Sequence, residues 1–170
     1  MMMRGVAAPR AKQLWIMTDA AREARAAGVP FGDIVDPFGE PVKRAFALWS
    51  AIVDAGAEQR FLSRYLAAAW AEGVDITTDA GLDAVLVGAG LDPEVVHAEA
   101  DPDRSTTILD ANLETMNDAG LWGVPSFRLL DRDGTELLAS WGQDRIWRVG
   151  AEIVARAGGA PGLALPERTE

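Results

Sequence analysis

The chain has 170 residues, of which 49% are hydrophobic, so it is long enough for one domain with a substantial core. It has no cysteine and a single histidine, His97. This excludes disulfides, cysteine nucleophiles and zinc–cysteine sites, and it disfavours a metal site built from histidines. The 26 acidic and 16 basic residues give a net charge of −10, which disfavours nucleic acid as a partner. No apolar run approaches the roughly 20 residues that span a bilayer, so we expect no membrane segment and a cytoplasmic protein.

Helices are predicted for the first half of the chain, from apolar residues spaced three and four apart and from proline or glycine at their ends. Residues 1–8 lack this spacing and are expected to form a loop. Three helices are predicted after it, over residues 9–28, 41–56 and 61–70.

The middle of the chain continues with helices. Thr77 or Thr78 can cap a short helix, because a threonine oxygen there accepts a hydrogen bond from a free backbone N–H. A second short helix is predicted around residues 95–96. A longer one follows over residues 104–119, with four residues facing inward: Ile108, Leu109, Leu113 and Met116.

Strands are predicted only after Gly123. Residues 126–130 and 135–140 form two antiparallel strands in this interpretation, because Asp133-Gly134 supplies the positive φ that a tight hairpin needs. The Val124-Pro125 bond before them can be cis or trans, since the trans preference before proline is only about 0.5–1 kcal/mol. Asp144 is expected in the first turn of a last helix, at its positive end.

We therefore predict a single domain over residues 1–170. It consists of a helical block at 9–120, a ββα end at 123–157 and a tail without pattern at 158–170.

Four motifs occur in an order known from one protein family. They are Lys12-Gln13-Leu14-Trp15 with Asp19 and Arg22, Ala69-Trp70-Ala71-Glu72-Gly73-Val74-Asp75-Ile76, Gly123-Val124-Pro125, and Gly142-Gln143-Asp144-Arg145. With them the chain resembles the 2-hydroxychromene-2-carboxylate isomerases and the kappa-class glutathione transferases, within the DsbA-like thioredoxin superfamily. The resemblance covers nearly the whole chain, to about residue 157. It implies an α/β, thioredoxin-like fold with a large helical insertion, and glutathione as the bound cofactor.

The resemblance also implies a glutathione site. Val124-Pro125 would be a cis-proline segment, with the Val124 backbone pairing to the cysteinyl part of glutathione. Gln143 and Asp144 would hold its γ-glutamyl end, and Lys12 would pair with one of its carboxylates. Asp144 also fits a helix-dipole partner, and Lys12 also fits a solvated surface charge. The six tryptophans fit core or interface anchors better than a cofactor site.

The chain departs from the family at its start. Family members open with a strand, a serine-containing turn, a helix and a second strand, and this N-terminal βαβ segment is missing here. The catalytic residue therefore stays unknown, since no serine stands at the matching place: Ser50, Ser63, Ser105, Ser126 and Ser140 all lie elsewhere. Met1 is then either an internal start or the start of a truncated chain that finds its strands in a partner.

Two functions are expected from these observations. The first is a glutathione-dependent isomerase or transferase, acting on a small aromatic-derived substrate by reversible thiol addition and forming a homodimer. The second is a non-catalytic, thioredoxin-like binding module. Disulfide exchange is disfavoured, because the chain has no cysteine.

Overall fold

The computed structural model describes residues 8–158. The chain divides into two compact units, the first ending at Ile108 and the second beginning at Leu109. The predictions of a loop at residues 1–7 and of a tail at 159–170 lie outside the described residues.

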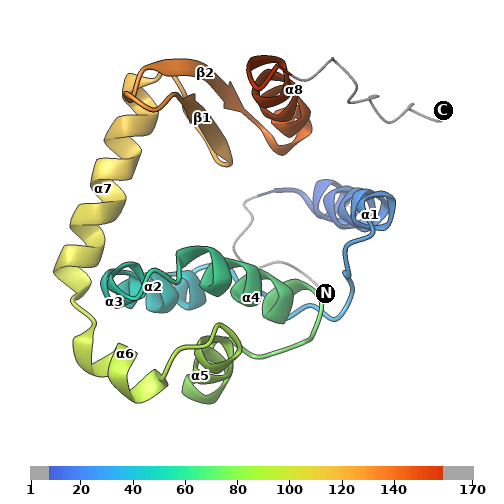
Figure 1. Ribbon diagram of the computed structural model, residues 1–170. Coiled ribbons are helices and arrows are strands. Elements are labelled where there is room, and N and C mark those ends of the chain that lie inside the picture. Colours follow the sequence, from blue (N-terminus) through green and yellow to red (C-terminus); the bar gives the residue numbers. More distant parts are fainter. Residues whose placement is uncertain (1–7, 159–170) are drawn as a thin grey trace. The chain divides into compact units, whose positions relative to one another are not determined.

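Helices α1 to α7 come first in the chain, the two strands follow, and helix α8 comes last (Figure 1). Their bounds are α1 Arg10–Ala27, α2 Glu40–Ala47, α3 Trp49–Asp54, α4 Glu58–Trp70, α5 Asp79–Gly88, α6 Pro93–Glu99, α7 Pro102–Asp118, β1 Ser126–Leu130, β2 Glu136–Trp141, the 3-10 turn η1 Gln143–Arg145, and α8 Ile146–Arg156. Within residues 8–158, no helix is long and apolar enough to cross a membrane.

The predicted helix over residues 41–56 is wrong in one respect, because the chain breaks at Leu48 into α2 and α3. A side chain from α7 fills the break. The hydroxyl of Ser105 accepts the backbone N–H of Ser50 at 3.0 Å and donates to the carbonyl of Ala47 at 3.2 Å. The two backbone groups released by the break are thus paired, as buried backbone groups must be.

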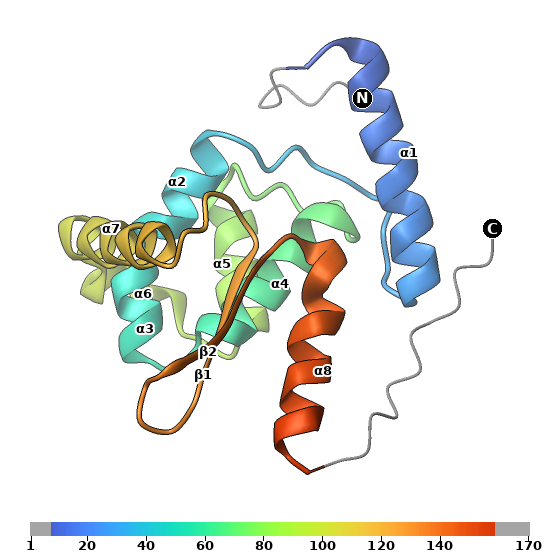
Figure 2. The ribbon, with the colours of Figure 1, turned by 90° about the horizontal axis from the view of Figure 1, so that it is seen from above.

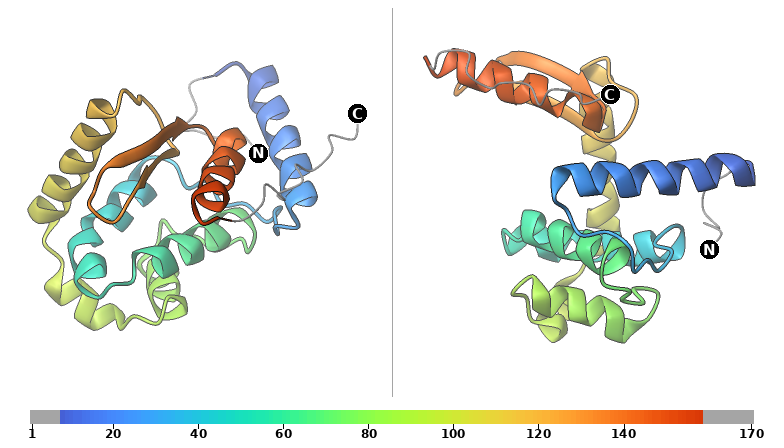
Figure 3. Two further views of the ribbon diagram at one scale, coloured as in Figure 1. Left: turned by 45° about the horizontal axis from the view of Figure 1, so that its top comes forward. Right: turned by 90° about the vertical axis from the view of Figure 1, so that its right-hand side faces the viewer.

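The core of the first unit is a row of aromatic rings on α2, α3 and α4. Phe46 meets Trp49 with ring centroids 5.7 Å apart, Trp49 meets Phe61 at 6.4 Å, and Phe61 meets Tyr65 at 6.0 Å. Helix α5 packs beside α4, and both views of Figure 3 show the pair (teal-green and yellow-green). The helical insertion therefore has a packed centre of its own.

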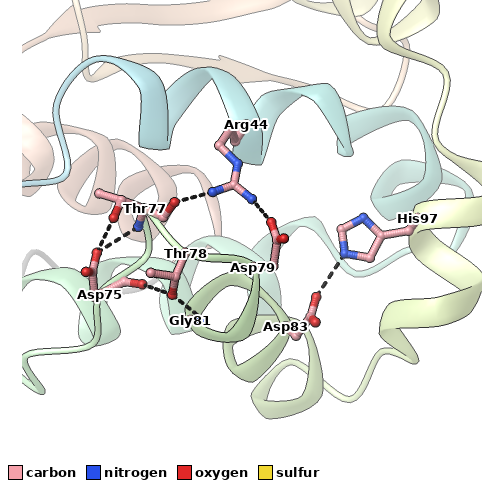
Figure 4. Close-up of polar contacts among 8 residues, drawn as sticks. All are labelled: Arg44, Asp75, Thr77, Thr78, Asp79, Gly81, Asp83 and His97. Atoms are coloured by element: carbon pink, nitrogen blue, oxygen red, sulfur yellow. Dashed lines mark hydrogen bonds and ion pairs between the residues drawn. The ribbon is translucent and has the colours of Figure 1, made fainter.

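Thr78 caps α5, as the sequence predicts, and its hydroxyl accepts the N–H of Gly81 at 3.1 Å. Arg44 of α2 donates to the Thr77 carbonyl and to the Asp79 carboxylate, so α2 is tied to the start of α5 (Figure 4). His97 of α6 meets Asp83 of α5 at 2.9 Å. The Arg44 contacts thus hold the loop before α5 against α2, and the His97 contact joins α6 to α5.

The second unit contains the predicted hairpin. Strands β1 and β2 pair antiparallel from Ser126↔Trp141 to Leu130↔Glu136, with a bulge between Leu129 and Leu130. Gly134, with φ +87°, supplies the positive φ expected in the turn. Helix α8 lies along the hairpin in the views of Figures 1 and 2.

The second unit buries few side chains. Among its described residues only three are buried: Leu121, Ser140 and Gly142. Leu113 of α7 and Ile146 of α8, which sit at regularly spaced apolar positions, are 52% and 58% exposed. The inward position predicted for Leu113 is therefore wrong.

Tyr65 makes the stability of the fold depend on pH. The residue is 8% exposed, and its hydroxyl has no hydrogen-bond partner among the described residues. Burial raises the pKa of Tyr65 from its usual 10.0 to about 12. The phenol therefore ionises first in the unfolded chain, and the free energy of unfolding should fall as the pH rises from about 10 to about 12.

The variant Tyr65→Phe tests this expectation. Near neutral pH it should unfold at about the same urea concentration as the natural chain, since the lost hydroxyl leaves no partner unpaired. At about pH 11 it should be the more stable of the two. Urea unfolding at both pH values measures the difference. An equal loss of stability in both proteins at high pH would show that other groups cause it.

Candidate ligand site

The Gly123-Val124-Pro125 segment enters strand β1. The Val124-Pro125 peptide bond is cis, so the cis form that the resemblance implies is confirmed. Val124 is 86% exposed, and neither of its backbone groups takes part in a hydrogen bond within residues 8–158. Its backbone N–H and carbonyl are thus open to a ligand with an extended backbone.

A hydrogen bond joins this segment to the end of strand β2. The backbone N–H of Gly142 donates to the Pro125 carbonyl at 3.0 Å, continuing the β1–β2 register by one pair. Gln143 and Asp144 follow Gly142 directly. The hairpin therefore brings the cis-proline segment next to Gln143 and Asp144, which lie 18 and 19 positions beyond Pro125 in sequence.

Gly142 shapes the position of the Asp144 carboxylate. Gly142 is buried and has φ +98°, and a Cβ on it would collide with Oδ1 of Asp144. The absence of a side chain thus lets the carboxylate fold back over the Gly142 backbone. The other carboxylate oxygen, Oδ2, lies 3.5 Å from Nη1 of Arg145, with the two side chains 62% and 46% exposed. An ion pair this exposed is weak, so the Asp144 carboxylate can leave Arg145 and pair with a cationic group of a ligand.

The predicted place of Asp144 needs one correction. Residues 143–145 form a 3-10 turn, and the α-helix begins only at Ile146, so Asp144 precedes the helix instead of lying in its first turn. The reason is local, because the Arg145 N–H bonds to the Gly142 carbonyl at 3.1 Å and closes a tighter turn. The backbone N–H groups of Arg145 and Ile146, directly after Asp144, are both paired within this turn, to the carbonyls of Gly142 and Gln143.

Four of the five predicted site residues lie together in the second unit: Val124, Pro125, Gln143 and Asp144. Gln143 is exposed. Lys12 belongs to α1 in the first unit and is also exposed. The role of Lys12 as a partner for a ligand carboxylate stays a prediction.

None of the serines offers a hydroxyl beside this segment that is both unpaired and exposed. Ser126 is the nearest in sequence, and its hydroxyl donates to the Gly123 carbonyl. Ser140 is 5% exposed on β2, and its hydroxyl has no partner among the described residues. Ser50 and Ser105 are buried in the first unit, and Ser63 lies on the surface of α4.

The second unit also has an open hollow beside the start of β1, with a volume of about 310 Å³. Helix α7, strand β1 and the chain between them line it, with Asn112, Thr115, Met116, Leu121, Ser126 and Arg128. Arg128 is held by Glu136, whose Oε2 lies 2.7 Å from its Nε. Within residues 8–158 no three histidine or acidic side chains gather as they would around a metal ion.

Two tryptophans that the sequence motifs did not single out lie beside this segment. Of the six tryptophans, Trp49 alone is buried. Trp122 and Trp141 lie next to Gly123 and Gly142, with ring centroids 5.4 Å apart. A tryptophan next to a glycine in each of the two site motifs was the signal available in the sequence.

Comparison with known protein families gives a match for this chain. Residues 4–153 match the family described as the DSBA-like thioredoxin domain. A search of curated proteins gave no match. The matched region contains all the helices and both strands except the last turn of α8, and the helices-then-hairpin order fits a thioredoxin fold with a helical insertion. The fold class expected from the sequence is thus confirmed, and the chain belongs to the DsbA-like thioredoxin domain family.

Proposed function

We propose that this chain binds glutathione and takes part in a glutathione-dependent isomerisation or transfer, of the kind catalysed by the 2-hydroxychromene-2-carboxylate isomerases that it resembles. The observation that carries the proposal is the Gly142 N–H to Pro125 carbonyl bond. It brings an open backbone segment and an exposed carboxylate together in one compact unit. A γ-glutamyl peptide needs both kinds of partner.

Each residue would serve one part of the ligand. The N–H and carbonyl of Val124 would pair with the cysteinyl residue, as one strand pairs with another. The Asp144 carboxylate would accept hydrogen bonds from the γ-glutamyl ammonium group, a charge-assisted contact. The exposed Gln143 side chain carries an amide NH₂ group that would donate to the glutamyl carboxylate.

When bound, glutathione supplies a thiol that adds reversibly to a conjugated double bond of the substrate. The 170 residues contain no cysteine, so a thiol at this site comes from the ligand. The chain would hold the thiol at Val124 and fix its direction of attack, which replaces a collision between free molecules by a positioned reaction. The proposal includes a homodimer, as the resemblance implies, and the cytoplasmic location expected from the sequence.

A binding module without turnover is the second candidate. It is favoured by Ser126, whose hydroxyl is already donated to Gly123 and is not free to assist a thiol. The first candidate requires glutathione to bind, whereas the binding module would hold a thiol compound or a protein partner without turnover. They differ in whether the full chain with glutathione isomerises a hydroxychromene carboxylate.

Calorimetric titration of the full chain with reduced glutathione tests the proposal. We expect binding, and we expect Asp144→Ala to weaken it by about tenfold to a hundredfold, since a hydrogen bond to a charged group contributes about 1.5–3 kcal/mol. Asp144→Asn should lie between the two. Asp110→Ala, which removes an exposed carboxylate from α7 in the same unit, is the control and should bind as the natural chain does.

Two results would count against this assignment. Unchanged affinity in Asp144→Ala would remove Asp144 from the site. Absence of binding by the natural chain would overturn the proposed function as a whole.

A further inference from the structure

Trp122 and Trp141 form an exposed aromatic pair in the second unit. Their ring planes are inclined by 36° with centroids 5.4 Å apart. Trp122 is 70% exposed and Trp141 is 38% exposed. Tryptophan is enriched at binding surfaces, where its indole contributes a large apolar contact area, so two exposed indoles in contact are a candidate binding surface.

The backbone holds Trp141 in place. A Cβ on Gly123 would lie 2.6 Å from Nε1 of Trp141 and 3.4 Å from its Cδ1, so the indole lies directly over the Gly123 backbone. Gly123 thus permits the approach of the ring, and the Trp122 ring lies against it at a tilt. The pair therefore forms part of the hairpin end.

The pair borders the proposed glutathione site on both sides. Trp122 is two residues before Val124, and Trp141 is two residues before Gln143. Two residues separate Cα atoms by no more than about 7 Å, so both indoles lie within reach of a ligand seated on Val124 and Gln143. A group attached to the ligand's sulfur would meet them first.

We propose that the Trp122–Trp141 pair binds the flat, conjugated part of the second substrate. This inference rests on the proposed function and adds the site for the partner of the thiol. Reversible thiol addition requires a double bond conjugated to a carbonyl, and such a group is planar. A planar π-system stacks on an open indole face. Attack of the thiolate sulfur on the double bond forms a C–S bond, breaks the C=C π bond and leaves the electron pair on the conjugated carbonyl oxygen as an enolate. The pair then holds the flat part of the substrate while the rest rotates about the former double bond, and loss of the thiolate restores the C=C bond.

Two glutathione derivatives separate this site from the glutathione site itself. S-methylglutathione tests the peptide contacts alone, and S-benzylglutathione adds a flat ring at the sulfur. Calorimetric titration of the full chain should give S-benzylglutathione the higher affinity, by about tenfold. In Trp122→Ala this preference should fall to about twofold or less, with the affinity for S-methylglutathione unchanged. Trp122→Phe should keep most of the preference.

Leu130→Ala is the control. Leu130 is 45% exposed at the turn end of β1, whereas Trp141 pairs with Ser126 at the opposite end of the hairpin, so this change removes an exposed apolar side chain of the same unit away from the pair. It should leave the affinities for both derivatives unchanged. Thermal unfolding of each variant verifies that it is folded.

Several outcomes would overturn the inference. A preference for the benzyl group that survives in Trp122→Ala would show that the ring binds elsewhere. An equal loss of affinity for both derivatives would assign Trp122 to glutathione itself. A change from dimer to monomer in Trp122→Ala, with the preference intact, would make the pair a subunit contact. Failure of S-methylglutathione to bind the natural chain would instead overturn the proposed function, and this inference with it.

Discussion

Replacement of Phe61 by alanine should lower the free energy of unfolding by about 3–5 kcal/mol. Phe61 is 1% exposed, and among the described residues it is the largest side chain that is completely buried. Its ring contacts Trp49 on one side and Tyr65 on the other, so its loss opens a cavity between α3 and α4. Neighbouring rings cannot collapse fully into such a space, which adds a cavity cost to the lost burial.

Urea unfolding followed by circular dichroism measures this effect. Leu62→Ala is the control, because Leu62 is the next residue of α4 but is 39% exposed. It should cost about 1 kcal/mol or less, and the slope of the transition should stay the same in both variants. A loss for Phe61→Ala no larger than for Leu62→Ala would mean that the aromatic row is not the centre of the first unit.

The ends of most elements could be predicted from the sequence, because glycine and proline act locally. Gly28 ends α1 with φ +67°, and Gly134 turns the hairpin with φ +87°. These angles depend on the residue itself and hardly on distant contacts. The break at Leu48 could not be predicted in this way. It depends on Ser105, which lies 55 residues after Ser50 in sequence. The Ser105 hydroxyl accepts a hydrogen bond from the Ser50 backbone N–H.

Burial was harder to predict than helical periodicity. The apolar spacing of α7 and α8 correctly indicates helices, but Leu113 and Ile146 are both more than half exposed. A repeat of three and four residues shows which side of a helix is apolar. It does not show whether another element covers that side, because covering depends on how many elements pack around it.

The candidate site could also be predicted from the sequence only in part. Val124, Pro125, Gln143 and Asp144 stand in motifs that can be read in order. The bond between the Gly142 N–H and the Pro125 carbonyl, which joins the two motifs, follows from the strand register. The turn at Asp133-Gly134 predicts that the two strands pair antiparallel, whereas the register, with its bulge between Leu129 and Leu130, comes from the structure. The tryptophan pair did not follow, because a tryptophan is usually a core residue and nothing in its spacing indicates exposure.

Replacement of Gly81 by alanine should destabilise the first unit by about 3 kcal/mol or more, although alanine is the better helix former. Gly81 lies in the first turn of α5 (Figure 4), and its φ is not in the left-handed region. The obstacle to a side chain at this position is steric. A Cβ there would collide with the Asp75 carbonyl oxygen and lie 2.6 Å from the carbonyl carbon.

The loop from Asp75 to Thr78 cannot yield without further loss. The Asp75 carbonyl accepts the Thr78 N–H at 3.2 Å and the Thr78 hydroxyl at 2.8 Å. Between them Ile76 is completely buried. Moving the Asp75 carbonyl away from a new methyl group therefore breaks the cap of α5 and draws Ile76 out of the core.

Gly88→Ala is a matched control at the other end of the same helix. A Cβ on Gly88 would also lie close to other atoms, 2.6 Å from Nε, 2.8 Å from Cδ and 3.0 Å from Cγ of Arg64, but these atoms all belong to a flexible side chain and none to the backbone. Arg64 can turn away and lose only its partly exposed ion pair with Glu72, which costs little. Both variants gain the same helix propensity from alanine, so the difference between their unfolding free energies isolates the backbone contact at Asp75. Equal stability of the two variants would show that the 75–78 loop can shift freely and does not hold α5.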